Sequence, residues 1–262
     1  MHMKDIEQKE TLIPILSSFQ PVSLKGMNKI KLLNRQDTKF IFNFKKLPSL
    51  LEQLKDKYYV LEVEDLRITQ YESQYFDTDD LRFYTQHHNG KLNRHKVRYR
   101  CYVESNTCYF EIKLKSNKGR TIKERIKKEK TNEIKGKKAK QLLRKNIAVN
   151  PGDLSAKLWI YYSRITLAHK DFTERVTIDV NLKFASKVRE KSLSELIIAE
   201  VKQDKISLSS PFIQLMRKEK IQPMRLSKYC IGTILTNENI KYNRFKPKLL
   251  TINKIAYYGN AA

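Results

Sequence analysis

The chain has 262 residues, and its 53 Lys and Arg against 28 Asp and Glu give a formal net charge of +25. Hydrophobic residues make up 40% of it, which argues against global disorder, and the lack of any linker rich in Pro, Gly or Ser favours a single domain over residues 1–262. The charge predicts an acidic partner, which is nucleic acid, an anionic membrane surface or a polyanionic substrate.

Several kinds of site are excluded by what the sequence lacks. The polar start does not resemble a signal peptide, and no run approaches the roughly 20 apolar residues of a membrane helix, so we expect a cytoplasmic protein without a membrane span. Cys101, Cys108 and Cys230 are odd in number and lack CxxC spacing, which predicts neither structural zinc nor a disulfide framework. The motifs GxGxxG, GxxxxGKS/T, GxSxG and HExxH are absent. With only seven glycines, the chain would have to hold phosphate with side-chain cations.

Before residue 93 the pattern predicts helices alternating with strands. In one predicted strand, Arg35, Asp37 and Lys39 share a face, while Phe40 lies on the other. The expected elements are, in order, a helix over 5–19, a strand over 35–44, a helix over 48–58, a strand over 68–78 and a helical turn capped by Asp79 and Asp80.

Residues 93–128 predict three consecutive strands in which charged side chains alternate with apolar ones. The bland interpretation is a solvated sheet face with scattered cations. Three strands in aligned register favour a functional surface instead, because their apolar faces must themselves be covered. The charged positions of the first two strands are Lys96, Arg98, Arg100, Glu111, Lys113 and Lys115.

Turn lengths predict how these strands pair. A two-residue loop over 105–106 would place Arg98 opposite Lys113, and a three-residue loop over 117–119 would place Lys113 opposite Lys123. Opposed like charges destabilise a sheet by roughly 0.2–1 kcal/mol per pair, so a row of three cations calls for an anion, of which phosphate is the obvious candidate. The neighbouring row would hold Arg100, Glu111 and Arg125.

The second half of the chain adds strands of the same kind. Glu200 interrupts an apolar strand and therefore needs a partner or a metal, and Lys228 in the first turn of a helix opposes the helix dipole, which indicates a nearby anion. The expected elements are a Lys-rich helix within 132–145, strands over 158–168, 173–184 and 196–202, helices over 211–219 and 226–235, and a basic tail over 241–248 that wraps an edge or stays mobile.

These elements predict an α+β fold in which about eight antiparallel strands close into a barrel with flanking helices. A closed barrel would let the charged faces line one basic tunnel suited to a chain of phosphates, and Glu200 could hold a divalent ion there. The inward-facing set would be Arg35, Lys39, Arg98, Arg100, Glu111, Lys113, Lys115, Lys123, Arg125, Arg164, Arg175, Asp179, Glu200 and Lys202.

Nine short motifs occur in an order and spacing that resemble the VTC domain, the polyphosphate polymerase module of the vacuolar transporter chaperone complex and of many bacterial proteins. They are RQDTKF, YFDT, HxxGKxNRxKVRxR, EIKxK, GRTIKER, YSR, ERVTID, AEVK and RLSKY. The resemblance covers about residues 20–236, which leaves an N-terminal helix over 1–19 and a basic C-terminal tail over 237–262. It implies a triphosphate tunnel metalloenzyme of the CYTH-like superfamily, with a basic barrel and Mn²⁺ or Mg²⁺ as cofactor.

The resemblance implies roles for individual residues, and the strand pattern adds Lys115, Arg125 and Lys202 to them. Glu200 resembles the metal-binding carboxylate. Catalytic roles are expected for Arg98, Arg100, Lys113, Lys123, Arg164 and Arg175. Binding of substrate phosphates is expected for Lys39, Lys115, Arg125, Lys202 and Lys228.

The activity implied is transfer of the γ-phosphoryl group of ATP to a growing polyphosphate chain, with a separate membrane protein as a further partner if the product is exported. Hydrolysis of triphosphate or polyphosphate in the same tunnel is one alternative, and non-catalytic binding of polyphosphate or RNA is another. Cations that follow strand periodicity and mix with acidic residues argue against nucleic acid. Opposed cations argue against a purely structural role.

Overall fold

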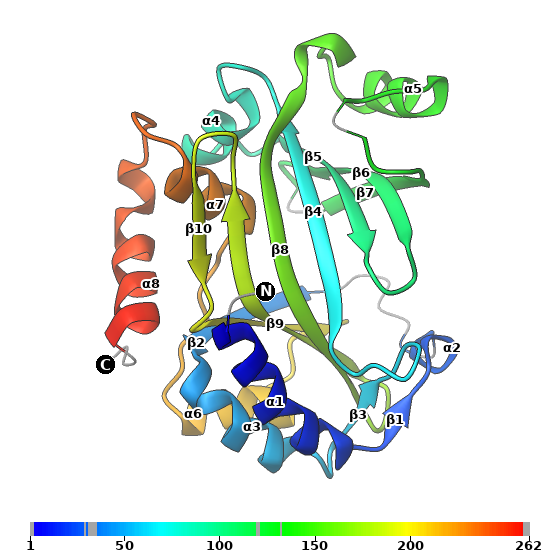
Figure 1. Cartoon of the computed structure of the whole chain (residues 1–262), viewed down its shortest axis with the longest axis vertical. Coiled ribbons are helices and arrows are strands. Elements are labelled where there is room, and N and C mark those ends of the chain that lie inside the picture. The colour runs from blue at the N-terminus through cyan, green and yellow to red at the C-terminus, as the bar shows by residue number, and fades with distance from the viewer. Residues whose placement is uncertain (1–2, 29, 31–35, 119–120, 132, 259–262) are drawn as a thin grey trace.

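The computed structural model describes residues 3–28, 30, 36–118, 121–131 and 133–258, and within them one large sheet with helices packed around it (Figure 1). The strands are β1 (Pro21–Val22), β2 (Gln36–Asn43), β3 (Tyr58–Leu61), β4 (Thr69–Asp77), β5 (Arg94–Tyr102), β6 (Thr107–Lys115), β7 (Thr121–Lys127), β8 (Ser155–His169), β9 (Glu174–Ala185), β10 (Glu190–Leu193) and β11 (Leu196–Gln203). The helices are α1 (Met3–Ser17), α2 (Leu24–Met27), α3 (Leu47–Leu54), α4 (Arg82–His88), α5 (Lys137–Asn146), α6 (Pro211–Lys218), α7 (Lys228–Thr236) and α8 (Lys246–Tyr258), with 3-10 turns η1 (Phe44–Lys46), η2 (Pro151–Asp153) and η3 (Asn243–Phe245).

The sheet is antiparallel along its main path but is not closed into a barrel. Eight strands pair in the order β2-β11-β9-β8-β4-β5-β6-β7, and β1, β3 and β10 bring the sheet of the described residues to 11 strands. The α+β class and the antiparallel pairing are therefore confirmed, whereas closure and the total of about eight strands are corrected. Closure would require hydrogen bonds between β2 and β7, and in the described part of the chain these strands are the two ends of the path.

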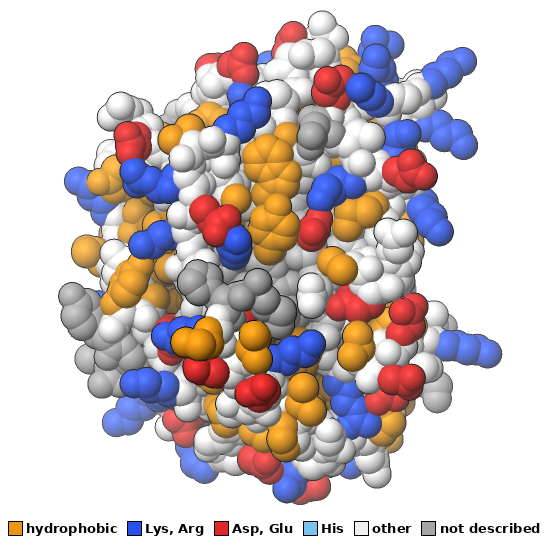
Figure 2. All heavy atoms as spheres, viewed as in Figure 1, with side chains coloured by type: hydrophobic (Ala, Val, Ile, Leu, Met, Phe, Trp, Pro, Cys, Tyr) orange, Lys and Arg blue, Asp and Glu red, His pale blue; other side chains and the backbone are white. Residues whose placement is uncertain are grey.

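Helices cover the apolar side of the sheet. α1, α3 and α6 lie together at the bottom of Figure 1 and bury one core against alternate residues of β2, β8, β9 and β11. α5 packs Ala139 and Leu143 on Val97, Phe110 and Ile112. Figure 2 shows Lys and Arg side chains gathered around the exposed side of α5, at the upper right. The predicted Lys-rich helix is thus confirmed as a solvated element at the periphery.

Another core lies under α7 and α8 and closes one end of the polar side. Ile198 and Glu200 share a face of β11, and Ile198 belongs to this core together with Phe184. Gly232 allows α7 to approach closely, since a Cβ there would meet the Cδ1 of Phe184 at 2.4 Å. α7 consequently delivers Lys228 to the polar side at the point where the apolar packing stops.

The register of the first hairpin differs from the expectation by two residues. β5 and β6 are joined by the four-residue loop 103–106, in which Asn106 takes the left-handed conformation (φ 42°). This loop places Arg98 opposite Glu111 and Cys101 opposite Cys108. The two cysteines form a disulfide, which the expectation of no disulfide framework did not foresee. In the register of the two-residue loop, Cys101 would have lain opposite Phe110 and could not have paired with Cys108.

The second hairpin has the predicted register. Lys113 lies opposite Lys123, and Glu111 lies opposite Arg125. The two charged rows are therefore Lys96, Lys113 and Lys123, and Arg98, Glu111 and Arg125. The end of the predicted loop at Gly119 and the start of the predicted strand at Arg35 fall outside the described residues.

Two further expectations are corrected at α4 and at the C-terminal segment. The N-terminus of α4 is capped by Asp77, whose carboxylate accepts hydrogen bonds from the backbone N–H groups of Phe83 (2.9 Å) and Tyr84 (3.0 Å). The basic tail continues into α8, which buries Ile252 and Ile255. None of the described helices combines the length and apolar character needed to cross a membrane.

Candidate phosphate-binding site

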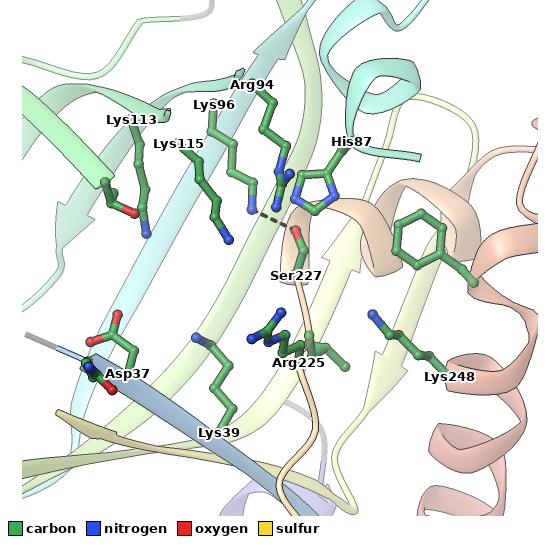
Figure 3. A pocket seen from close by; sticks show the side chains of 14 residues that line it. Asp37, Lys39, His87, Arg94, Lys96, Lys113, Lys115, Arg225, Ser227 and Lys248 are labelled. Carbon is green, nitrogen blue, oxygen red and sulfur yellow. Dashed lines mark hydrogen bonds between the residues drawn. The ribbon is translucent and has the colours of Figure 1, made fainter. Parts of the chain in front are cut away.

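A cavity of about 500 Å³ is lined by both end regions of the sheet (Figure 3). β2 contributes Asp37 and Lys39 and β6 contributes Lys113 and Lys115, and these side chains point toward one another across the cavity. Among the lining residues that the structure describes, Asp37 provides the one carboxylate. The cations are Lys39, Arg94, Lys96, Lys113, Lys115, Arg225 and Lys248. Such an excess of positive charge in a partly enclosed space attracts a polyanion.

Beside the cavity, Glu111 is 1% exposed and holds two cations. Arg98 donates from Nε (2.8 Å) and approaches with Nη2 (2.7 Å), and the Nζ of Lys123 lies 2.5 Å from the other carboxylate oxygen. Burial alone would raise the pKa of Glu111, but Arg98, Arg100 and Lys123 lower it to about 2. Arg98 also donates to the hydroxyl of Tyr75 at 2.7 Å, which fixes the guanidinium in place.

Asp179 forms a similar cluster. Arg164 binds it with two parallel hydrogen bonds, of 2.6 Å from Nε and 2.9 Å from Nη2, and Lys228 pairs with the same carboxylate. Burial opposes ionisation, but the charges of Arg164 and Lys228 lower the pKa of Asp179 to about 2. The guanidinium of Arg164 lies over the rings of Tyr71 (4.8 Å) and Tyr162 (5.2 Å). Cation–π contacts with two aromatic rings thus add to the ion pair in holding this guanidinium.

Glu200 forms the third cluster. The Nζ of Lys39 lies 3.0 Å from one of its oxygens and the Nζ of Lys202 lies 2.5 Å from the other. Although burial acts against ionisation, these two lysines hold the pKa of Glu200 well below its usual range. Burial lowers the pKa of Lys202 to about 8 despite the attraction of Glu200.

All three clusters follow from strand pairing. The residue directly opposite Glu111 is Arg98, and the residue opposite Asp179 is Arg164. Lys39 likewise lies directly opposite Glu200. Side chains at directly opposed positions lie about 4.5–5.5 Å apart at Cβ, which suits an ion pair. Each carboxylate therefore neutralises part of the cationic wall, whereas the cavity keeps an excess of cations.

The excess of positive charge also affects the pKa values of the cavity lysines. Burial lowers the pKa of Lys113 to about 8, and the charges of Lys96 and Arg98 act in the same direction. Burial and then Arg94, Arg225 and Lys39 lower the pKa of Lys115. A bound anion would favour the charged form of each lysine, so binding of an anion in this cavity should be accompanied by proton uptake.

The buried carboxylates predict a loss of stability in acid. Because the folded pKa values of Glu111 and Asp179 lie near 2, below the ordinary 4.5 and 3.8, each contributes stability that is present above the ordinary pKa and is lost as pH falls toward 2. A pKa difference of this size corresponds to roughly 2–3.5 kcal/mol per carboxylate. We expect urea unfolding to show this decrease between pH 5 and pH 3.

The Glu111→Gln variant tests the origin of the effect. It should be less stable than the wild type at pH 7 and lose less further stability on acidification. The matched control is Glu190→Gln, because Glu190 is 52% exposed and pairs with Lys183 on the surface; this variant should keep the wild-type profile. Parallel pH profiles for Glu111→Gln and the wild type would contradict the assignment.

The structure brings most of the predicted residues to one polar surface. Lys39, Lys113 and Lys115 line the cavity, while Arg98, Lys123, Arg164, Lys202, Glu200 and Lys228 lie in the carboxylate clusters. Arg100 donates from Nε to Ser73 at 3.4 Å. Arg125 lies over the ring of Tyr109 at 4.5 Å, on exposed β7. Arg175 lies opposite Lys202 at the start of β9 and is half-buried.

Several cavity residues were missed. Lys96 lies two residues before Arg98 and therefore on the same face of the strand, which is a signal that could have placed Lys96 in the site. Arg225 lies within the RLSKY motif. His87 is the first residue of the HxxGKxNRxKVRxR motif, which is a signal of the same kind. Lys248 carries no comparable signal, because it reaches the cavity from a C-terminal segment whose helix was not predicted.

Asp37 on β2 and Glu200 on β11 are the carboxylates to consider as metal ligands. Glu200 lies opposite Lys39 and Asp37 lies opposite Lys202, so the two carboxylates occupy diagonal positions on paired strands. Among the described residues, no group of three or more His, Cys, Asp or Glu is placed to hold a metal ion. Two carboxylates nevertheless fit Mg²⁺ or Mn²⁺, since such ions take their remaining ligands from substrate phosphates and water.

The sequence model of one family covers most of the chain. The VTC domain model matches residues 34–237, which include β2 to β11, α6 and α7. The chain belongs to the VTC-domain family. Comparison of this VTC domain with curated proteins gave no match.

Solved structures show a fold similar to that of the VTC domain. A Hippeastrum protein, HpAC1, described as a candidate adenylyl cyclase with a dominant triphosphatase activity, is 13% identical, with a TM-score of 0.51 over 79% of this chain and 99% of its own. A protein from Vibrio parahaemolyticus described as a candidate adenylate cyclase is 11% identical, with a TM-score of 0.43 over 74% and 95% of the two chains. At 13% identity, the similarity to HpAC1 concerns the fold alone.

Proposed function

We propose that the VTC domain transfers the γ-phosphoryl group of ATP to the end of an inorganic polyphosphate chain bound in the cationic cavity. The observation that carries this proposal is the cavity itself, with seven Lys and Arg and one carboxylate among its described lining residues, directly beside three carboxylate clusters, two of which hold further arginines. In the transfer, a terminal phosphate oxygen of the chain attacks the γ-phosphorus, the bond to the bridging oxygen breaks, and ADP leaves.

The residues supply what this reaction needs, which is alignment of the phosphates and neutralisation of their charge, without a protein nucleophile. Arg98 and Arg164 present planar N–H groups that can hold two phosphate oxygens each, and the glutamate or aspartate opposite fixes each guanidinium. Lys39 and Lys113 act as point charges. Glu200 and Asp37 would hold Mn²⁺ or Mg²⁺, which would polarise the phosphoryl oxygens.

Hydrolysis of triphosphate or polyphosphate is the second candidate, with water in place of the acceptor chain. The triphosphatase activity described for HpAC1, which has a similar fold, favours including it. A binding module for polyanions without catalysis would use the same cations but would need no metal. Use of ATP would place the reaction in the cytoplasm, as the sequence predicts.

One incubation distinguishes these functions. The purified protein is mixed with ATP, a short polyphosphate primer and Mn²⁺ or Mg²⁺, and the same tube is assayed for long polymer on a gel and for free phosphate. We expect polymer and ADP, and no product when a chelator is present. Free phosphate without polymer would assign the protein as a hydrolase, and no product with retained polyphosphate binding would leave a binding module.

A further inference from the structure

The outer side of the cavity is built in part by residues that the family match does not include. Lys248 and Phe245 come from α8 and η3, beyond residue 237, and both line the cavity. α8 is fixed in place because Ile252 and Ile255 are buried in the core that it shares with α7. Figure 3 shows Lys248 extending from α8 toward Arg225 and His87, on the side of the cavity away from Lys113.

The cations on this side make their described contacts with neutral groups. Arg94 donates to the carbonyl oxygen of Lys91 at 2.9 Å and Lys96 donates to the hydroxyl of Ser227 at 2.8 Å, while the Nζ of Lys248 lies 5.7 Å from the centre of the Phe245 ring. This differs from the clusters of Glu111, Asp179 and Glu200, where a carboxylate already balances the cations. The outer side therefore has more unbalanced positive charge to offer an incoming anion.

The same positive charge acts on the pKa of His87. Burial lowers its pKa to about 3, and Lys96, Arg94 and Lys248 contribute in the same direction. The imidazole is thus neutral at pH 7 and available as a hydrogen-bond partner among three cations. Its position on α4 adds a third element, besides the sheet and α8, to this wall of the cavity.

We propose that Lys248, Arg94 and His87 form an outer phosphate subsite that binds polyphosphate units beyond a triphosphate, so that the C-terminal helix makes this protein prefer long chains. The subsite rests on the proposed function, because it extends the same cavity. It adds a substrate preference: triphosphate contacts the inner cations alone, whereas a longer chain contacts Lys248 as well.

The test compares two probes, inorganic tripolyphosphate and long-chain inorganic polyphosphate, by calorimetric titration at several salt concentrations. Lys248→Ala should weaken long-chain binding by about threefold to tenfold and leave the dissociation constant of tripolyphosphate within a factor of about two. The salt dependence of long-chain binding should become shallower, because one phosphate contact is lost. Lys254→Ala is the matched control, since Lys254 is exposed on the same helix and does not line the cavity.

Each outcome decides the proposal. Unchanged binding of both probes by Lys248→Ala, or equal weakening of both, would overturn the outer subsite while leaving the proposed function intact. A wild-type protein that binds neither probe would overturn the proposed function itself. If Lys248→Ala unfolds, Lys248→Met keeps an unbranched apolar side chain without the charge and serves the same comparison, with folding monitored by circular dichroism.

Discussion

Replacement of Glu200 by Gln will lower kcat by about 10²–10³-fold, the usual effect of removing one group that stabilises developing charge. The substitution keeps the size of the side chain but removes the negative charge that faces Lys39 and Lys202. It should also weaken activation by Mn²⁺, because Asp37 alone would remain to hold the ion. The measurement is phosphoryl transfer as a function of Mn²⁺ concentration.

The control for this experiment is Glu195→Gln. Glu195 pairs with Lys4 of α1, outside the cavity, and its loss should leave the metal dependence unchanged. Lys202 gives a second readout: without Glu200 its pKa, already near 8, should fall further. A Glu200→Gln variant with wild-type kcat and wild-type metal dependence would exclude Glu200 as a metal ligand.

Replacement of Arg98 by Ala will reduce kcat by at least about 10³-fold, as expected for an arginine that neutralises charge in phosphoryl transfer. Arg98 is the cation that contacts both Glu111 and Tyr75, so its guanidinium is held in one orientation. Arg98→Lys should restore the positive charge but not the paired hydrogen bonds, so its kcat should lie between that of Arg98→Ala and that of the wild type. Steady-state kinetics of polymer formation or phosphate release provide the measurement.

Arg189→Ala is the matched control, because Arg189 is 52% exposed and pairs with Glu238 on the surface. It should behave as the wild type does. Folding of Arg98→Ala must be checked by thermal unfolding, since Glu111 loses its direct partner and retains Lys123. If a folded Arg98→Ala variant turns over at the wild-type rate, phosphate binding does not occur at this cluster.

Periodicity in the sequence was enough to predict the polar face of the sheet. The alternation around Arg98, Lys113 and Glu200 placed these residues on one surface, and the structure has them there. Periodicity says which face a side chain takes but not which residue it meets. The ion pair of Arg164 and Asp179 depends on the register of β8 on β9, which contains an irregularity between Tyr161 and Ser163.

Loops and long-range geometry account for the errors. The predicted register of the first hairpin was wrong by two residues, because the loop has four residues, with Asn106 in the left-handed conformation, and not the expected two. Barrel closure depends on strand tilt and stagger, which no local pattern reports. α8 was not predicted because a proline inside a segment usually indicates a helix break. Pro247 instead lies in the first turn of α8, where proline is tolerated. Lys248 lies on this helix, so its place in the cavity was not predicted either.

The open sheet has a further consequence for β7. In the described part of the chain this strand pairs with β6 along one side, and its other side carries unpaired backbone groups that a foreign strand could join. Lys123, Arg125 and Lys127 are exposed along it. Lysines on an edge strand repel a second copy of the same edge. We therefore expect the positive charge of β7 to oppose aggregation, apart from any role in the proposed phosphate binding, and the solubility of variants that neutralise β7 should be measured before their activity.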